Sequence, residues 1–180
     1  EAPAVHADAP PRHRATPAQP PEADADAEVG ALRPAVSSAV FSQTNRLREA
    51  RDRAPLHRDS TLARIACWHN QNMLANNYMG HRDADGRTPG DRMAREHRRL
   101  IGSAGENVYE GDNFRHRPGR EEADDWAARI MSRWMESPGH RKNILRPEFT
   151  HLGACVTHTV TMSKATQMFA AVWGYLDEPL

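Results

Sequence analysis

The sequence predicts an α+β domain in which the helices come first and the strands come last. Apolar residues recur at helical spacing before Pro138, most clearly over residues 60–77 and 121–135. After the Pro138-Gly139 break, apolar and polar residues alternate in two short segments, as they do in strands. Helices followed by strands favour a layered α+β domain, and no internal repeat is visible.

Residues 1–35 differ in composition from the rest of the chain. They are rich in Ala and Pro and lack apolar periodicity, so they cannot bury enough surface to offset the entropy of an ordered backbone. We predict a flexible tail over residues 1–35, interpreted as a tether to an envelope surface, and a folded domain over residues 36–180. A binding motif within the tail is the alternative.

Composition and charge disfavour several classes of function. The chain has 180 residues, a formal net charge of zero and no apolar run near the ~18 residues that span a bilayer. The net charge is −3 over residues 1–35 and +3 over the remainder, and neither value favours nucleic acid or membrane binding. Because the chain starts at Glu1 rather than Met, we expect either a removed targeting segment or a trimmed sequence.

Breakers and caps delimit the first two predicted helices. The first helix is predicted over residues 37–51 and ends before Pro55-Leu56. Asp59 or Ser60 can cap the second helix, which runs to about Asn77. The buried stripe of this second helix comprises Leu62, Ile65, Ala66, His69 and Met73.

The elements predicted further along the chain are shorter and separated by turns. They are a turn at Asp85-Gly86, a short helix over residues 89–93, a helix over residues 121–135, strands over residues 152–157 and 167–175, and a hairpin near residues 161–164. We expect Trp126, Trp134 and Trp173 to be core anchors.

Three short motifs carry the candidate chemistry. They are Gly80-His81-Arg82, Gly105-Glu106-Asn107 and Ser137-Pro138-Gly139-His140-Arg141. Together they offer two imidazoles and one carboxylate, each beside a glycine or turn residue that lets the backbone approach closely. Such groups hold a divalent metal, or act as acid and base, where a fold brings them together.

A longer ordered set of motifs resembles a known family. The set comprises Asn45-x-x-Arg48, Pro55-Leu56, Tyr78, Gly80-His81, Gly105-Glu106-Asn107, Trp134-Met135-x-Ser137-Pro138-Gly139-His140-Arg141-x-Asn143-Ile144-Leu145 and Phe149-Thr150-x-Leu152-Gly153. It is similar to the bacterial branch of the CAP superfamily, which comprises cysteine-rich secretory proteins, antigen 5 and pathogenesis-related 1 proteins, and whose domains are also called SCP domains. The resemblance spans about residues 38–175.

The resemblance implies a three-layer α-β-α sandwich with a small, mostly antiparallel sheet and a cavity lined by two His and two acidic side chains. Three of these four positions match His81, Glu106 and His140. In many members the second acid follows a helix Trp by three residues, and Ser137 holds that position here. Glu136 is adjacent, but one residue on a helix turns a side chain by about 100°, so we expect it to point elsewhere.

The resemblance also implies a secreted, periplasmic or envelope-associated protein whose cavity binds a small apolar, lipid or cell-envelope ligand. We expect His81, Glu106 and His140 to hold a divalent metal, with zinc as the first choice, and Ser137 to line the cavity. The alternative is a metal-assisted hydrolase of peptides or esters with Glu106 as general base. The missing second acid favours binding over catalysis.

Each of these residues also has a purely structural interpretation. His81 could hydrogen-bond loop backbone, Glu106 could satisfy amides near a strand start, and Ser137 could cap the next turn. A Ser137–His140 nucleophile pair is disfavoured because no orienting third group is visible. We expect Asn143 to tie its loop through the side-chain amide.

Several further residues have structural interpretations. The arginine cluster lacks interleaved aromatic residues and is interpreted as a solvated face; it comprises Arg92, Arg95, Arg98 and Arg99. His69 is interpreted as a satisfied core histidine, because it lies on the apolar stripe of its helix. Tyr109 and Phe114 are candidates for the cavity mouth.

The two cysteines leave two alternatives open. Cys67 and Cys155 could form a disulfide, which the chain-entropy argument values at roughly 4–5 kcal/mol for this separation, or remain two buried thiols. Export from the cytoplasm would make the disulfide plausible.

Overall fold

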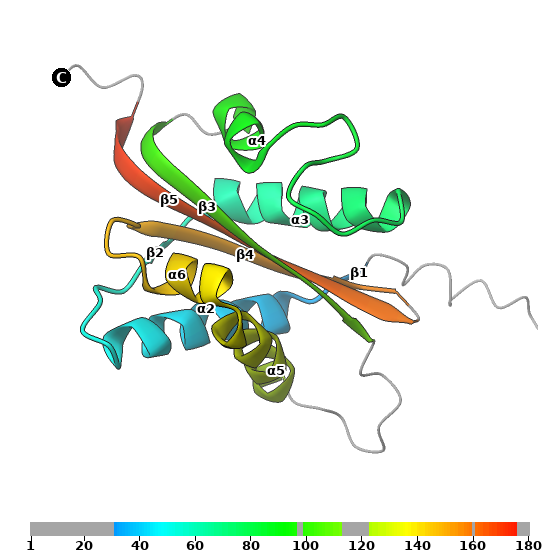
Figure 1. Ribbon diagram of the computed structural model, residues 1–180, viewed down its shortest axis with the longest axis horizontal. Coiled ribbons are helices and arrows are strands. Elements are labelled where there is room, and N and C mark those ends of the chain that lie inside the picture. Colours follow the sequence, from blue (N-terminus) through cyan, green and yellow to red (C-terminus); the bar gives the residue numbers. More distant parts are fainter. Residues whose placement is uncertain (1–30, 97–98, 113–122, 160, 176–180) are drawn as a thin grey trace, which may run out of the picture.

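The computed structural model describes residues 31–96, 99–112, 123–159 and 161–175 (Figure 1). The elements are β1 (Ala31–Leu32), α2 (Pro34–Glu49), β2 (His57–Arg58), α3 (Ser60–Ala75), α4 (Pro89–Glu96), β3 (Arg99–Asp112), α5 (Ala123–Glu136), α6 (Pro138–Leu145), β4 (His151–His158) and β5 (Met162–Tyr175). Predictions for residues 1–30 and for Phe114 lie outside the described residues. Within the described ranges, no helix is both long and apolar enough to cross a membrane.

The strands form one sheet with the order β1-β4-β5-β3, and β2 also pairs with β4. Every pairing is antiparallel except that of β2 with β4, which is parallel. The prediction of a mostly antiparallel sheet is therefore confirmed. β3 is an outer strand, paired with β5 from Arg99↔Tyr175 to Asp112↔Met162. This placement matters because Glu106 lies in the middle of β3.

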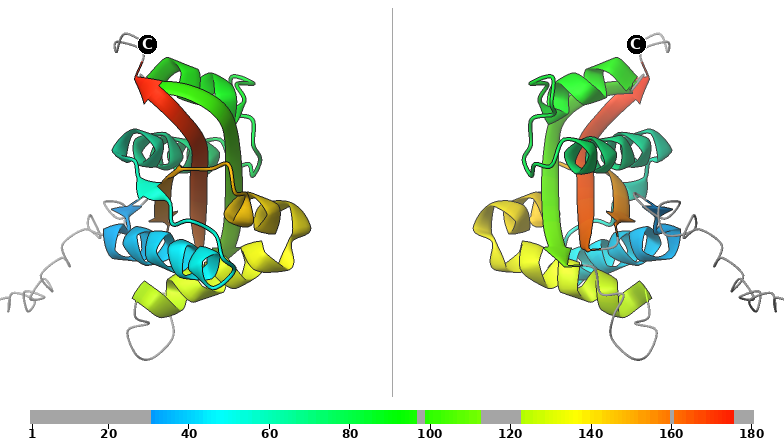
Figure 2. Two further views of the ribbon diagram at one scale, coloured as in Figure 1. Left: turned by 90° about the vertical axis from the view of Figure 1, so that its left-hand side faces the viewer. Right: turned by 90° about the vertical axis from the view of Figure 1, so that its right-hand side faces the viewer.

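Helices cover both faces of the sheet, with α3 and α4 on one face and α2, α5 and α6 on the other (Figures 1 and 2). Because successive side chains of a strand point to opposite faces, β4 and β5 contribute to two separate cores. Leu152 and Phe169 pack in the core with α2, α5 and α6, whereas Cys155 and Met168 pack in the core with α3. The predicted three-layer α-β-α sandwich is confirmed.

The folded part begins earlier than the predicted boundary at residue 36. Helix α2 starts at Pro34, a position that suits proline because the first turn of a helix has no partner for a backbone N–H. Ala31 and Leu32 already pair with His158 and Thr157 of β4. Residues 31–35, which composition assigns to the tail, therefore belong to the domain.

The helix α3 follows the sequence prediction closely. Oδ1 of Asp59 accepts the backbone N–H of Leu62 at 2.9 Å, so Asp59 is the cap of the two candidates. The predicted stripe is buried, with His69 fully so. The helix stops at Ala75, and Asn77 then adopts a positive φ of 49°, a conformation that Asn tolerates better than most residues.

A disulfide and a glycine hold α3 against the sheet. Cys67 on α3 and Cys155 on β4 form a disulfide with their Cα atoms 5.1 Å apart, which decides between the two alternatives. Beside it, α3 crosses β4 at Gly153. A Cβ at Gly153 would lie 2.1 Å from the backbone N of Ala63 and 2.2 Å from the carbonyl carbon of Leu62. Only glycine allows this approach.

The strand β3 and the helix α6 were not predicted. β3 contains three glycines and several polar residues, so it lacks the apolar-polar alternation that marks a strand. Its extended backbone is held instead by the antiparallel pairing with β5. The helix α6 begins at Pro138, where the sequence pattern predicts a break instead. Proline breaks a helix from within but fits its first turn.

The tryptophans match the prediction only in part. Trp126 and Trp134 are buried, but Trp173 is 78% exposed, so its prediction as a core anchor is wrong. Trp173 lies near the end of β5. It comes after Ala171, which is the last β5 residue in the core formed with α2, α5 and α6. Its ring packs instead against Gly102 of β3, where an added Cβ would meet the ring atoms.

Candidate functional site

Glu106 is a buried carboxylate in the middle of β3. Its side chain is 1% exposed, although β3 is an outer strand. Oε1 lies 2.9 Å from Nδ1 of His81, and Oε2 contacts Nη2 of Arg92. The neighbouring Gly105 makes room on the opposite face of the sheet, because a Cβ there would lie 2.7 Å from the ring of Phe149. The structure therefore brings together the motifs Gly80-His81-Arg82 and Gly105-Glu106-Asn107. Both oxygens of the Glu106 carboxylate have a donor as partner.

His81 lies on the loop between α3 and α4, and its side chain is 52% exposed. The hydrogen bond to Glu106 raises the pKa of His81 above its ordinary value, although burial acts in the opposite direction. Since Nδ1–H is donated to Glu106, the neutral ring carries its lone pair on Nε2. Nε2 is therefore the nitrogen available to a metal or another ligand.

Arg92 is the charge partner of Glu106, and its prediction as part of a solvated face is wrong. The residue is 3% exposed. Besides contacting Glu106, its Nη1 donates to the carbonyl oxygens of His81 at 2.9 Å and Arg87 at 3.1 Å. Spacing within the short helix could not reveal this role, because the partner comes from β3. Arg92 both neutralises the buried carboxylate and holds the loop that carries His81.

His69 is a second histidine beside Glu106, and the prediction that it is buried is confirmed. Its Nε2 lies 2.8 Å from the carbonyl oxygen of Gly80 and 3.8 Å from Oε1 of Glu106. Burial lowers the pKa of His69, so the ring is neutral and donates from Nε2. His69 thereby fixes the backbone next to His81. Its position on the helix stripe showed its burial but not this contact.

His140 lies on α6, which a network of amides joins to β3. Nδ2 of Asn107 donates to the carbonyl oxygen of His140 at 3.1 Å. Nδ2 of Asn143 donates to the carbonyl oxygen of Glu106 at 3.1 Å and to Oδ1 of Asn107 at 2.9 Å, the tying role predicted for Asn143. Burial, and then the charge of His81, lower the pKa of His140.

A groove of about 630 Å³ runs along the end of β3 beside His140. Its walls come from β3, α5 and the start of α6, and they include Tyr109, Trp134 and Ser137. Nε1 of Trp134 donates to the carbonyl oxygen of Val108 at 3.0 Å, which joins α5 to the strand. Of the four predicted cavity residues, His140 and Ser137 line this groove, whereas His81 and Glu106 do not. We call this the His140 groove.

The comparisons with known proteins match this architecture. The family model of the cysteine-rich secretory protein family, CAP, matches residues 41–169. The chain belongs to the CAP family. The CAP domain is similar to the uncharacterized Bacillus subtilis protein YkwD, with 33% identity over 75% of this chain and 47% of YkwD. It therefore spans about half the length of that relative.

Solved structures share the fold of this CAP domain. An extracellular SCP-domain protein from Bacillus anthracis is 31% identical, with a TM-score of 0.59 over 75% of this chain and 40% of that one. NaASP2, in a structure with Zn²⁺, is 11% identical, with a TM-score of 0.56 over 78% of this chain and 81% of that one. This second likeness concerns the fold alone.

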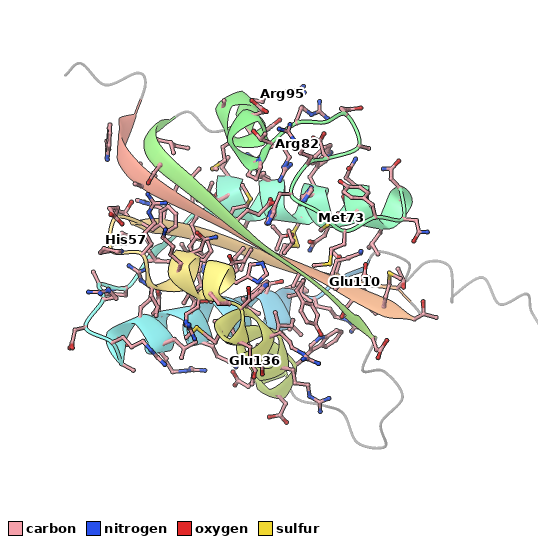
Figure 3. The ribbon with its side chains drawn as sticks, in the orientation of Figure 1. His57, Met73, Arg82, Arg95, Glu110 and Glu136 are labelled. Carbon is pink, nitrogen blue, oxygen red and sulfur yellow. A yellow bond between two sulfur atoms is a disulfide. The ribbon has the colours of Figure 1, made fainter. Side chains whose placement is uncertain are left out.

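The CAP domain has no carboxylate at the position of the second acid. Ser137 stands there as the residue before α6, and its side chain makes no capping hydrogen bond, although its carbonyl oxygen accepts the N–H of Arg141 at 2.9 Å. Glu136 on α5 (Figure 3) is among the residues that line the His140 groove, and its side chain is 63% exposed and pairs with Arg133.

The three predicted metal ligands differ in what they can offer. Among the described residues, no group of three or more His, Cys, Asp or Glu side chains is placed to hold a metal ion. Glu106 gives one oxygen to His81 and the other to Arg92, and a guanidinium at that position repels a second cation. The imidazoles of His81 and His140 remain as donors. Glu106 fits the role of an outer partner that orients His81.

Proposed function

We propose that this CAP domain is an extracytoplasmic binding module rather than an enzyme. In this proposal the His140 groove takes a small ligand, and His81 and His140 hold a divalent metal beside it. The observation that carries the proposal is the state of Glu106, a buried carboxylate with both oxygens in contact with donors. A carboxylate held in this way orients His81.

The donor chemistry supports zinc as the first metal to test. His81 offers Nε2, and the lowered pKa of His140 keeps that ring neutral at neutral pH, as a ligand must be. Zinc accepts imidazole nitrogens, and open sites complete the shell with water or ligand atoms. A bound ion would supply a Lewis-acid position for an oxygen of the ligand. The similarity in fold to NaASP2, solved with Zn²⁺, supports the same choice.

The lining of the His140 groove supports a ligand with an apolar body and polar groups. Met79, Val108 and Trp134 form its apolar surface, whereas Arg133 and Glu136 supply charge of both signs. A small lipid or cell-envelope fragment combines these features. The disulfide and the likeness to an extracellular Bacillus anthracis protein support a location outside the cytoplasm.

The geometry disfavours the hydrolase alternative. A general base needs an oxygen within reach of the proton that it removes, directly or through one water. Arg92 and His81 occupy the two oxygens of Glu106, and the side chain is 1% exposed. Metal-dependent turnover in a broad esterase and peptidase screen, abolished by Glu106→Gln, would establish the hydrolase instead.

Zinc titration by calorimetry on chelator-treated protein tests the metal site. We expect His81→Ala/His140→Ala to abolish binding and Glu106→Gln to weaken it by about 10–100-fold, as loss of an outer partner does. The matched control is His57→Ala/His151→Ala, a second pair whose ring centroids lie 5.3 Å apart. Unchanged zinc affinity in the first double variant would overturn the metal site.

A ligand screen tests the groove separately. We expect lipid and cell-envelope fragments that bind the protein to shift the NMR signals of Tyr109 and of the Trp134 indole. Ser132→Trp, which places a large side chain on the groove lining, should block binding. Ligands that bind this variant as well as the wild type would place the binding elsewhere.

A further inference from the structure

A second groove lies on the face of the molecule formed by α3 and α4. Its lining residues come from α3, the following loop and α4, and they are Arg64, Ile65, Trp68, Arg87, Arg92, Arg95 and Glu96. Its volume is about 290 Å³. Figure 3 shows Arg95 on α4, on the opposite side of the sheet from Glu136 on α5. We call this the arginine groove.

The arginine groove carries positive charge that its surroundings leave partly uncompensated. Arg87 is paired with Asp83 and Asp85, and Arg92 is paired with Glu106. Within the part of the chain that the structure describes, Arg64 and Arg95 have no ion-pair partner. Nη2 of Arg64 donates to Oγ1 of Thr61, a neutral group, at 3.3 Å. Glu96 is the single acid among the lining residues.

An exposed indole forms one wall of the same groove. Trp68 is 41% exposed, although its helix packs against the sheet. The guanidinium of Arg87 lies 5.4 Å from the centroid of the Trp68 ring. Ile65, 4% exposed, adds apolar surface from the next turn of the helix. The groove therefore combines a flat apolar wall with guanidinium groups.

Arg92 also lines the groove, and it has one hydrogen-bond donor without a partner among the described residues. Its two terminal nitrogens are used by Glu106 and by backbone carbonyl groups, whereas Nε is buried and has no partner among the described residues. A buried N–H without an acceptor is rare in a folded protein and is destabilising.

We propose that the arginine groove binds a small organic anion in which a carboxylate is attached to a flat aromatic ring. Arg64 and Arg95 hold the carboxylate, since guanidinium groups bind carboxylates through paired hydrogen bonds. Trp68 packs against the ring, because aromatic pairs add attraction beyond the area that they bury. The volume lies near the lower limit of small-molecule sites, which suits one or two fused rings.

This site is independent of the His140 groove and needs no metal. Arg92 lines the arginine groove and also contacts Glu106, which orients His81 in the proposed metal site. It is therefore left unchanged in the test. Arg64 and Arg95 are exposed, so their replacement leaves the cores intact.

The experiment titrates naphthalene-2-carboxylate into the full chain, followed by calorimetry and by the indole N–H signal of Trp68, which Trp68→Leu assigns. We expect saturable binding that Arg64→Gln/Arg95→Gln weakens by about tenfold or more. Naphthalene-2-carboxamide, which lacks the charge, and acetate, which lacks the ring, should each bind far more weakly. The matched control Arg46→Gln/Arg51→Gln removes the same charge near α2 and should leave the affinity unchanged.

Three results would overturn the site. The first is an absence of saturable binding to the wild-type protein. The second is equal affinity in Arg64→Gln/Arg95→Gln and the wild type. The third is equal affinity for the carboxylate and the carboxamide, which would show that the guanidinium groups play no part. Loss of zinc binding in the histidine variants bears on the other site and leaves this one unaffected.

Discussion

Nδ1 of His81 lies 2.9 Å from Oε1 of Glu106, and this contact joins a loop to the centre of an outer strand. His81 is half exposed, whereas Glu106 is buried. The carboxylate can remain there because Arg92 contacts its other oxygen. The contact determines which nitrogen of His81 carries a proton and which one faces a ligand.

Glu106→Gln is predicted to lower the pKa of His81. The hydrogen bond to the charged carboxylate is the main cause of the raised pKa, and a neutral amide favours the imidazolium less. Titration of the histidine Hε1 signals by NMR measures this change. Glu136→Gln, which alters an exposed carboxylate, is the control. An unchanged His81 pKa in Glu106→Gln would contradict the contact.

The same contact has a defined effect on the pH dependence of stability. Because the folded-state pKa of His81 is raised, the contact contributes stability that is fully present below the unfolded pKa of about 6.5 and is lost as pH rises through the folded pKa. Urea unfolding of wild type and His81→Ala over pH 5–9 measures it. The difference in unfolding free energy should shrink toward high pH, and a difference that grows would contradict this sign.

His69 is predicted to act in the opposite direction. Its folded-state pKa is lowered by burial, so its contribution is present above about pH 6.5 and is lost as pH falls through the folded pKa. The variant His69→Gln keeps an N–H donor for Gly80 but cannot titrate. Compared with the wild type, it should lose less stability between pH 7.5 and pH 5. Equal losses in both proteins would count against this role.

Arg92→Met is predicted to destabilise the domain by about 3–5 kcal/mol, which is the usual cost of removing one partner of a buried ion pair. The variant leaves Glu106 without its guanidinium and frees the loop at His81. Arg95→Met on the same helix is the matched control, because Arg95 is exposed, and it should change stability by less than about 0.5 kcal/mol. Similar midpoints of chemical unfolding for the two variants would show that the buried pair contributes little.

The contrast between Arg92 and Asp59 shows what the sequence could predict. Asp59 acts on the helix that it precedes, so local spacing identified it as one of two cap candidates, with Ser60 as the other. Arg92 acts on a carboxylate in another element, and nothing within its own helix distinguishes it from Arg95. Local rules therefore predicted caps and buried stripes, whereas the buried charge pair depends on tertiary structure.

The site shows the same division. The approach of His81 to Glu106 was predicted from the family resemblance, because their spacing in the chain carries no such information. The strand that holds Glu106 was missed because its glycines, including Gly105, break the alternation while making room for Phe149. The glycine that lets Phe149 pack against β3 thus removes part of the alternation by which a strand is recognised.

Removal of the disulfide is predicted to cost about 2–5 kcal/mol, as in other domains that lose a native disulfide. Cys67 and Cys155 are 88 residues apart in sequence, so the bond restricts a long loop of the unfolded chain. Unfolding of the wild type with and without reductant measures the effect. Cys67→Ala/Cys155→Ala should show the lower stability in both conditions. Two free thiols in unreduced, denatured protein would exclude the bond.

Gly153→Ala is predicted to destabilise the domain by about 3 kcal/mol, the upper end of usual overpacking penalties. The added Cβ would lie within 2.2 Å of the α3 backbone at Ala63 and Leu62, where no side chain can rotate away. Gly139→Ala is the matched control, since nothing lies within 4 Å of a Cβ there. Because Gly139 is in α6, alanine should be neutral or stabilising by up to about 1 kcal/mol. The disulfide between Cys67 and Cys155 holds α3 near Gly153 and therefore opposes any movement of α3 away from β4. Equal thermal midpoints for the two variants would show that α3 moves away nevertheless.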